Sequence, residues 1–268
     1  MIKRMAIIIE SSNVRGLADL PGARIDAANW RSFLMSDLGG AWKDHEIFMK
    51  SKPSAGFVKE LLNIYKDSYA FLAFSGHGFM EYNYSSRIYE TKICLNDNEQ
   101  SVLVDTIAPE RFGTAIFDCC RGIENVHGSI KIANESFAAG RSTSFGIGMD
   151  SANQIALNAR RGIQETISSL FLNKIESMCT HASIRMYSCS RKESAGEWEG
   201  DPKAGGYYTT LLLKGAESWY EEQKLKPNYA AYTTKQAHDF ACALMKNINP
   251  QQHPEYTPVW QSYPFAIG

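Results

Sequence analysis

Two short stretches of this chain end in residues that could carry out covalent chemistry. Residues 69–78 read YAFLAFSGHG and residues 114–122 read TAIFDCCRG, so each is an apolar run that stops at reactive or polar side chains. A thiol becomes a strong nucleophile when an imidazole lies within reach, because the imidazole accepts its proton and favours the thiolate. If the two stretches lie side by side, they predict a nucleophilic thiol at Cys120 with a base at His77.

The residues beside this pair fit the same chemistry, although a simpler reading exists. Glycines on both sides of His77 let the backbone approach a substrate, and the N–H groups of Gly78 and Cys120 could together hold a developing oxyanion. Strand alternation turns Cys119 away from Cys120, so we expect Cys119 to be a core thiol. Taken alone, however, residues 114–122 also fit a buried strand whose cysteines only pack.

Elements that position these residues follow from the apolar pattern. Continuous apolar runs favour strands buried on both faces, whereas apolar residues three and four apart favour helices. The predicted strands are 5–11, 46–49, 69–75, 114–119 and 184–189, and the predicted helices are 23–38, 54–67, 151–178 with a break at Gly162, 207–222 and 233–247. This alternation predicts an α/β fold, a mostly parallel sheet with helices on both faces. Sites in such sheets lie at the carboxyl ends of the strands.

The remaining segments are predicted to be irregular or edge structure. Residues 85–104 look like a hairpin around Asn96-Asp97-Asn98, and residues 122–150 look like a long surface loop. The proline-containing tail is expected to be irregular or an edge strand.

Composition limits the classes of function. The chain has 268 residues and a formal net charge of −1, so no global field draws it to nucleic acid or to an anionic membrane. No window approaches the roughly 20 apolar residues of a spanning helix, and residues 5–9 suit a first strand better than a signal peptide. Six cysteines without zinc-like spacing favour reduced thiols, a cytoplasmic location and no metal.

Several blocks of the chain resemble caspases and metacaspases. Residues 119–122, CCRG, resemble the caspase nucleophile frame with the histidine about 50 residues upstream. The aspartate two residues before Cys120 resembles the metacaspase pattern, and residues 69–78 resemble the metacaspase histidine strand. Residues 20–29, 188–195 and 205–212 resemble three further blocks, so the resemblance spans nearly the whole chain.

The resemblance implies a single caspase-like peptidase domain over residues 1–268, with a six-stranded, mostly parallel sheet. A large-subunit-like part would cover about residues 1–150 and a small-subunit-like part about residues 180–268. It implies Cys120 as nucleophile, His77 as general base and then acid, and Gly78 as oxyanion donor. The acidic metacaspase specificity pocket carries over as Asp26, Ser75 and Asp118.

The chain departs from both branches of the family at some positions. Leu20 stands near the place of the caspase pocket arginine, and Ala23 stands where metacaspases have a pocket cysteine. Arg24 lies close to Leu20 but is offset, and Arg121 has no role that the sequence assigns. No acidic calcium cluster is evident, so a calcium requirement is not predicted, and we expect no cofactor.

The expected function is therefore a cysteine endopeptidase that cuts protein or peptide substrates after Arg or Lys. Residues 122–161 contain Lys131, Arg141 and Arg160-Arg161, at which such an enzyme could cut itself. The oligomeric state stays open between monomer and homodimer. Three alternatives also stay open: a catalytically silent scaffold of the same fold, an Asp-directed caspase-type peptidase, and a nucleotide-binding α/β protein. The last lacks a phosphate-binding glycine motif.

Overall fold

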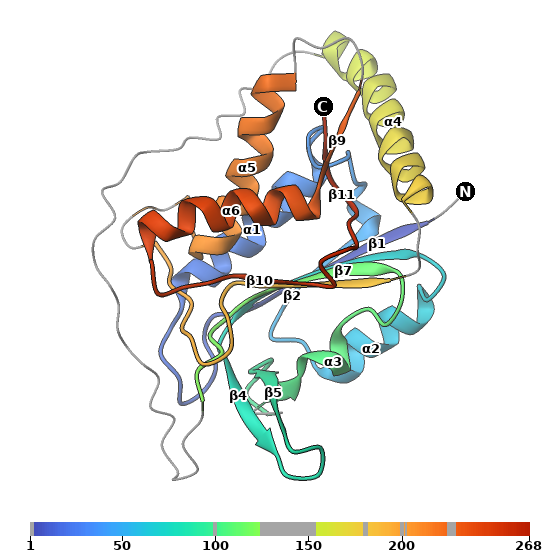
Figure 1. The fold of residues 1–268 in the computed structure, drawn as a ribbon. Coiled ribbons are helices and arrows are strands. Elements are labelled where there is room, and N and C mark those ends of the chain that lie inside the picture. Colours follow the sequence, from blue (N-terminus) through green and yellow to red (C-terminus); the bar gives the residue numbers. More distant parts are fainter. Residues whose placement is uncertain are drawn as a thin grey trace.

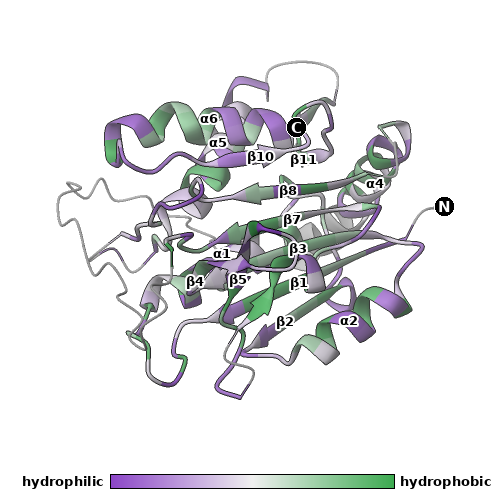
Figure 2. Ribbon diagram, turned by 60° about the horizontal axis from the view of Figure 1, so that its bottom comes forward, coloured by the Kyte–Doolittle hydropathy of each residue, from purple (hydrophilic) through white to green (hydrophobic). Residues whose placement is uncertain are grey.

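The computed structural model describes residues 3–98, 101–123, 154–178, 182–198, 201, 203–223 and 229–268, with only the backbone at 154–161. A six-stranded sheet forms its centre, in the order β10-β8-β7-β3-β1-β2 (Figure 2). The strands are β1 (Arg4–Ser11), β2 (Ile47–Ser51), β3 (Tyr69–Gly76), β7 (Gly113–Asp118), β8 (Ser183–Tyr187) and β10 (Glu255–Thr257). The first five are mutually parallel, and β10 runs antiparallel to β8 at the edge. The predicted α/β fold is confirmed.

The central strands are continuous apolar runs because both of their faces are covered. Every residue of β1, β3 and β7 is buried. On β1, Ala6 and Ile8 belong to one core, whereas Met5, Ile7 and Ile9 belong to a second core on the opposite face. Two hydrophobic cores therefore hold the sheet rigid between them, as the period-2 alternation of strand side chains requires.

Helices cover both faces, as Figure 1 shows. Those of one face are α1 (Pro21–Met35), α4 (Gln154–Ser177), α5 (Tyr207–Gln223) and α6 (Thr234–Ile248), and those of the other are α2 (Ala55–Ile64) and the short α3 (Val104–Ile107). A single 3-10 turn, η1 (Asp44–Glu46), precedes β2. Ser54 caps α2 by accepting the Phe57 N–H at 3.1 Å, as its residue type predicted. This arrangement leaves the carboxyl ends of β3 and β7 at one edge of the sheet.

The predicted helix break at Gly162 is wrong. α4 runs without interruption through this residue, and the Gly162 carbonyl accepts the Thr166 hydroxyl at 2.9 Å. A glycine inside a helix costs only about 1 kcal/mol relative to alanine. Burial of Ile167, Phe171 and Ile175 against the core outweighs that cost.

The segment after His77 holds one strand more than the sequence indicated. The predicted hairpin corresponds to β5 (Ile88–Ile93) and β6 (Val102–Leu103), joined by the loop that contains Asn96. An additional strand, β4 (Gly78–Asn83), pairs with β5 and starts directly after His77. The β4–β5 hairpin projects from the body of the molecule (Figure 1), so the histidine lies where the sheet strand passes into this hairpin.

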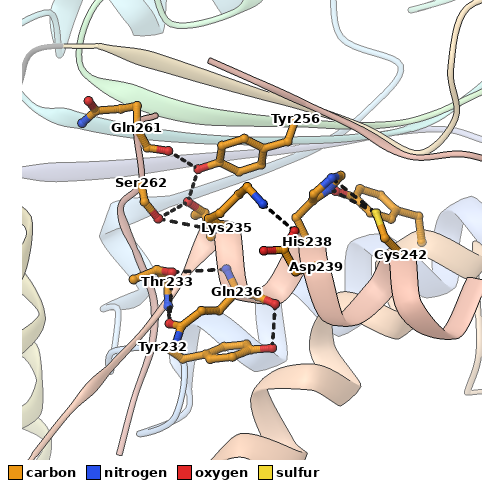
Figure 3. Close-up of polar contacts among 12 residues, drawn as sticks. Tyr232, Thr233, Lys235, Gln236, His238, Asp239, Cys242, Tyr256, Gln261 and Ser262 are labelled. Carbon is orange, nitrogen blue, oxygen red and sulfur yellow. Dashed lines mark hydrogen bonds and ion pairs between the residues drawn. The ribbon is translucent and has the colours of Figure 1, made fainter. Parts of the chain in front are cut away.

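The C-terminal tail closes the fold around the start of α6 (Figure 3). The Thr233 side chain accepts the Gln236 N–H, while the Gln236 side chain accepts the Thr233 N–H, forming a capping box. The Tyr256 hydroxyl lies 2.8 Å from the Thr234 hydroxyl and donates to the Gln261 carbonyl at 2.7 Å. The tail thus supplies β10 as an edge strand and β11 (Pro264–Ile267), which pairs with β9 (Ala231–Thr233).

Most of the predicted loop 122–150 lies outside the described residues, as do Lys131 and Arg141 and the side chains of Arg160 and Arg161. Within the described part of the chain, no helix combines the length and the apolar character needed to cross a bilayer.

Candidate active site

The two stretches that suggested chemistry lie side by side. β3 and β7 are neighbouring parallel strands, and Ser75 pairs in register with Asp118. His77 and Cys120 each follow two residues later, so both leave the same edge of the sheet. The condition on which the sequence-based hypothesis depended, that these strands be neighbours, is met.

His77 is held in one orientation by a backbone carbonyl. Its Nε2 lies 2.7 Å from the Ala18 oxygen. Because a carbonyl only accepts, Nε2 carries the proton and Nδ1 keeps the free lone pair. Burial lowers the pKa of His77, and the Ala18 carbonyl offsets this only in part. The imidazole is therefore neutral near pH 7 and presents Nδ1 as a base.

Cys120 is partly exposed, and its sulfur contacts the loop after β8. The Ala195 N–H donates to Sγ at 3.3 Å, and Sγ lies 3.6 Å from the Ala195 oxygen. In the described part of the chain, His77 and Cys120 hydrogen-bond to these partners rather than to each other. Burial, with the Asp118 charge, raises the pKa of the Cys120 thiol. Each of the two groups thus rests in its neutral form, and catalytic hydrogen bonds often form only with substrate bound.

Gly78 lies directly against the backbone of the cysteine pair. A Cβ at this position would come within 2.7 Å of the Cys119 sulfur and 2.8 Å of the Cys120 oxygen. The Met80 N–H donates to the Gly122 oxygen at 2.7 Å, which fastens β4 to the residues after the thiol. Cys119 itself is only 2 % exposed, and burial raises its pKa well above the usual range. Its position is that of a packing residue.

The three predicted pocket residues come together at the edge of the sheet. The Ser75 hydroxyl donates to Asp26 Oδ2 at 2.6 Å, and the Gly206 N–H donates to both Asp26 oxygens at 3.0 and 3.1 Å. Asp118 accepts the N–H and the hydroxyl of Thr209 at 3.0 and 2.8 Å. Asp26 is 0 % and Asp118 6 % exposed, so both carboxyl groups are fixed inside the protein.

Burial disfavours the ionised form of both carboxyl groups. Burial raises the pKa of Asp26 well above its usual range and also raises the pKa of Asp118, and the Asp118 charge adds to the effect on Asp26. Like charges that are removed from water cost free energy unless a counter-charge joins them. The wall over them is bare backbone: a Cβ at Gly205 would lie 2.1 Å from Asp26 Oδ1, and one at Gly206 would lie 2.4 Å from Asp118 Oδ2.

A third carboxylate, Glu197, belongs to the same site and was not found from the sequence. It accepts the Gly22 N–H at 3.1 Å through Oε2, and residue 197 forms an isolated bridge with Gly206. Its charge raises the pKa of both Asp26 and Cys120. In the sequence it is simply an acidic residue in the polar segment between the blocks 188–195 and 205–212.

Arg121, to which the sequence assigned no role, is a buried clamp behind the thiol. It is 3 % exposed and donates to Thr91 Oγ1 and the Cys189 oxygen, each at 3.1 Å. It also pairs with Glu255 at 2.5 Å and covers the Tyr187 ring at 4.2 Å. One side chain thereby ties the residue after Cys120 to β5, β8 and β10.

An arginine side chain and a metal ion are two further groups that could be sought near the site. Arg24, near the position of the caspase pocket arginine, forms a solvent-exposed ion pair with Asp19 at 2.8 Å. Among the residues that the structure describes, no three His, Cys, Asp or Glu side chains form a group suited to a metal ion.

Comparison with known proteins identifies the family and the fold. The model of the caspase domain matches residues 3–261. The crystal structure of caspase-1 from Spodoptera frugiperda aligns over 96% of this chain and 86% of its own, with a TM-score of 0.52 and 13% identity, which shows the fold alone. The structure of pro-sf-caspase-1 aligns over 96% and 88%, with a TM-score of 0.47 and 13% identity. Among curated proteins, no sequence matches. The chain belongs to the caspase-domain family, a family of caspase-fold peptidases.

Proposed function

We propose that this protein is a cysteine endopeptidase that cuts after Arg or Lys, with Cys120 as nucleophile and His77 as base. The observation that carries the proposal is the buried carboxyl pair of Asp26 and Asp118, joined through Ser75, at the strand ends that lead to Cys120 and His77. A buried acidic pocket selects a basic side chain, because it compensates the charges that burial disfavours.

The chemistry follows from the positions of these groups. His77 Nδ1 takes the proton of the Cys120 thiol as the sulfur attacks the scissile carbonyl, and the Gly78 and Cys120 N–H groups receive the oxyanion. The imidazolium then gives that proton to the leaving amine, so the peptide bond breaks and a thioester remains. Water attacks the thioester while His77 accepts its proton, which returns to the sulfur as the carboxylate product leaves.

Specificity comes from the geometry of the carboxylates. Asp26 already accepts Ser75 and Gly206, and Asp118 accepts Thr209, so both are oriented before substrate arrives. A planar guanidinium can bind two fixed carboxylates in a bidentate manner, whereas an ammonium acts as a point charge. We therefore propose that arginine is preferred over lysine.

Further features of the proposal concern the protein in its setting. Substrates are proteins or peptides with a basic residue before the cut, and no cofactor takes part. A cytoplasmic location and a monomer or homodimer complete the proposal.

Cleavage within residues 122–161 follows from the basic preference. Incubation of wild type beside Cys120→Ala tests it: uncut chains in both samples contradict self-cleavage.

A direct test compares peptides that carry Arg, Lys or Asp before a fluorogenic group. We expect Arg to be cleaved faster than Lys and Asp not at all. Cys120→Ala should lower kcat/KM by on the order of 10³-fold or more, and the matched variant Cys119→Ala should stay active. A preference for Asp contradicts the acidic pocket. Failure of the wild type to cleave any of the three favours the silent scaffold.

A further inference from the structure

The sulfur of Cys120 has its hydrogen-bond partners in the loop after β8. The Ala195 N–H points at Sγ from 3.3 Å, and a hydrogen bond from the Ser194 side chain lowers the pKa of the same thiol. Both groups belong to one dipeptide of the loop between β8 and α5. Hydrogen-bond donors that converge on a sulfur favour its ionised form, because they solvate the negative charge.

The need for such donors follows from the acidic pocket. Asp118 ends β7 two residues before Cys120, and Glu197 lies two residues after Ala195. Burial raises the pKa of Cys120, and both carboxylates raise it further, whereas the contacts from Ala195 and Ser194 lower it. The thiols of Cys119 and Cys189 are themselves held protonated by burial, which raises the pKa of each. The acids that select a basic substrate thus oppose formation of the thiolate.

In the resting protein, the proposed base His77 does not counteract the effect of the carboxylates on the pKa of Cys120. Burial lowers the pKa of His77, so the imidazole is neutral and supplies no positive charge next to the sulfur. The Arg121 guanidinium, although adjacent in sequence, is directed to Glu255 and the Cys189 oxygen. Donors on the dipeptide are therefore the favourable contacts left for the sulfur among its described neighbours.

The dipeptide is fixed on its amino-terminal side by Arg121. The Arg121 N–H donates to the Glu193 oxygen and the Lys192 N–H donates to the Arg121 oxygen, both at 2.8 Å. Lys192 takes a φ of +73°, a left-handed conformation uncommon for a residue with a side chain. Such a conformation persists where surrounding contacts over-determine it. The backbone next to the nucleophile thus fixes where the loop begins.

Gln252 fixes the dipeptide on its other side. Its Oε1 accepts the Gly196 N–H at 3.0 Å, and its Nε2 donates to the Ser188 oxygen at 2.9 Å. The side chain is 2 % exposed, so these bonds are shielded from water. Gln252 thereby ties the loop to the end of β8, and Ser194 and Ala195 are held between two anchors.

We propose that Ser194 and Ala195 form a sulfur cradle that stabilises the thiolate of Cys120 against the acidic pocket, with Gln252 as the residue that positions the cradle. The inference rests on the proposed function, since it assigns a purpose to the sulfur contacts of the same nucleophile. It goes beyond the dyad because it makes the loop after β8 a part of thiol activation.

Alkylation of Cys120 by iodoacetamide, read as a function of pH by peptide-resolved mass spectrometry, tests the cradle. The reagent is small and uncharged, so its rate follows the thiolate fraction and needs no specificity pocket. Ser194→Ala should raise the midpoint pH by roughly half to one unit and slow alkylation at pH 7 about 3- to 10-fold. Ser194→Thr keeps the hydroxyl and should stay near wild type. Ser190→Ala, which removes a hydroxyl that instead donates to the His253 oxygen, is the matched control.

Gln252→Met, which removes both anchoring bonds at similar volume, should move the midpoint in the same direction. An unchanged midpoint in Ser194→Ala overturns the cradle, as does a shift of equal size in Ser190→Ala. Because alkylation requires no peptide cleavage, this result is separate from the proposed function, which fails if wild type cleaves no Arg or Lys peptide.

Discussion

Ser75 pairs in register with Asp118 on the neighbouring strand, and its hydroxyl donates to Asp26 at 2.6 Å. One residue of β3 thus joins the two carboxylates of the pocket. The same pairing of β3 with β7 brings His77 and Cys120 out at one edge, two residues further along. A slip of one residue in this register would turn each side chain to the other face of the sheet, so the proposed specificity and the proposed catalysis both depend on one strand pairing.

The bare backbone over the carboxylates gives a first prediction. Gly206→Ala places a Cβ 2.4 Å from Asp118 Oδ2, which its Thr209 hydrogen bonds hold in place. We expect kcat/KM for an Arg peptide to fall on the order of 10²-fold, because the guanidinium is displaced. Alkylation of Cys120 by iodoacetamide should persist.

Gly22→Ala is the matched control for that variant. Its Cβ also comes within 2.4 Å of a carboxylate oxygen, but this one is the flexible end of Glu197. The side chain can move aside, so we expect a loss of less than about 10-fold in kcat/KM. Equal losses in the two variants would contradict a rigid pocket formed by Asp26 and Asp118.

Arg121 gives a prediction of stability. Arg121→Leu leaves the Cys189 oxygen without this buried donor and removes the ion pair with Glu255, so the free energy of unfolding should fall by about 2–4 kcal/mol. Arg24→Leu removes an ion pair of which both side chains are about half exposed, and it should cost less than about 1 kcal/mol. Denaturant unfolding of the two variants measures the difference. A loss in Arg121→Leu no larger than in Arg24→Leu would show that the clamp contributes little.

His238 predicts how stability depends on pH. It lies on α6 with Nε2 3.3 Å from the Cys242 sulfur (Figure 3). Its Nδ1 lies 2.8 Å from the Tyr208 hydroxyl, and burial lowers its pKa to about 4. An unfolded histidine has a pKa of about 6.5. Between these values the unfolded chain binds a proton that the folded chain does not, so stability is full above about pH 6.5 and falls as the pH drops toward 4.

The size of the loss in stability between pH 6.5 and pH 4 tests whether His238 causes it. A separation of about 2.5 pKa units corresponds to roughly 3 kcal/mol lost between pH 6.5 and pH 4. Unfolding of His238→Gln should show a correspondingly flatter pH dependence, whereas His45→Gln, on the surface turn η1, should leave the wild-type slope. If His238→Gln keeps the full slope, another group causes the acid destabilisation.

The fold could be predicted where the residues of a single segment indicate its secondary structure. β1, β3 and β7 are buried on both faces, so their runs of apolar residues were sufficient, and the reactive residues at their ends followed from the parallel sheet. The helix break predicted at Gly162 was wrong because the cost of a glycine, about 1 kcal/mol, is small compared with the free energy gained by packing a long helix.

The parts of the site that could not be predicted act through the backbone or across the chain. Ala18 and Ala195 contribute a carbonyl and an N–H, so their side chains carry no sign of the role. Glu197 and Gln252 reach the site only because loops from distant parts of the sequence meet there. Arg121 likewise shows its role only through Glu255, on another strand.

We propose that a buried acidic pocket directs Cys120 to peptide bonds after basic residues. Cleavage of a positional peptide library by wild type and by Asp118→Ala tests it most directly. We predict that wild type accepts Arg and Lys before the cut and that Asp118→Ala loses this preference while Cys120 still reacts with iodoacetamide. A wild type that shows no preference for a basic residue at that position would contradict the account.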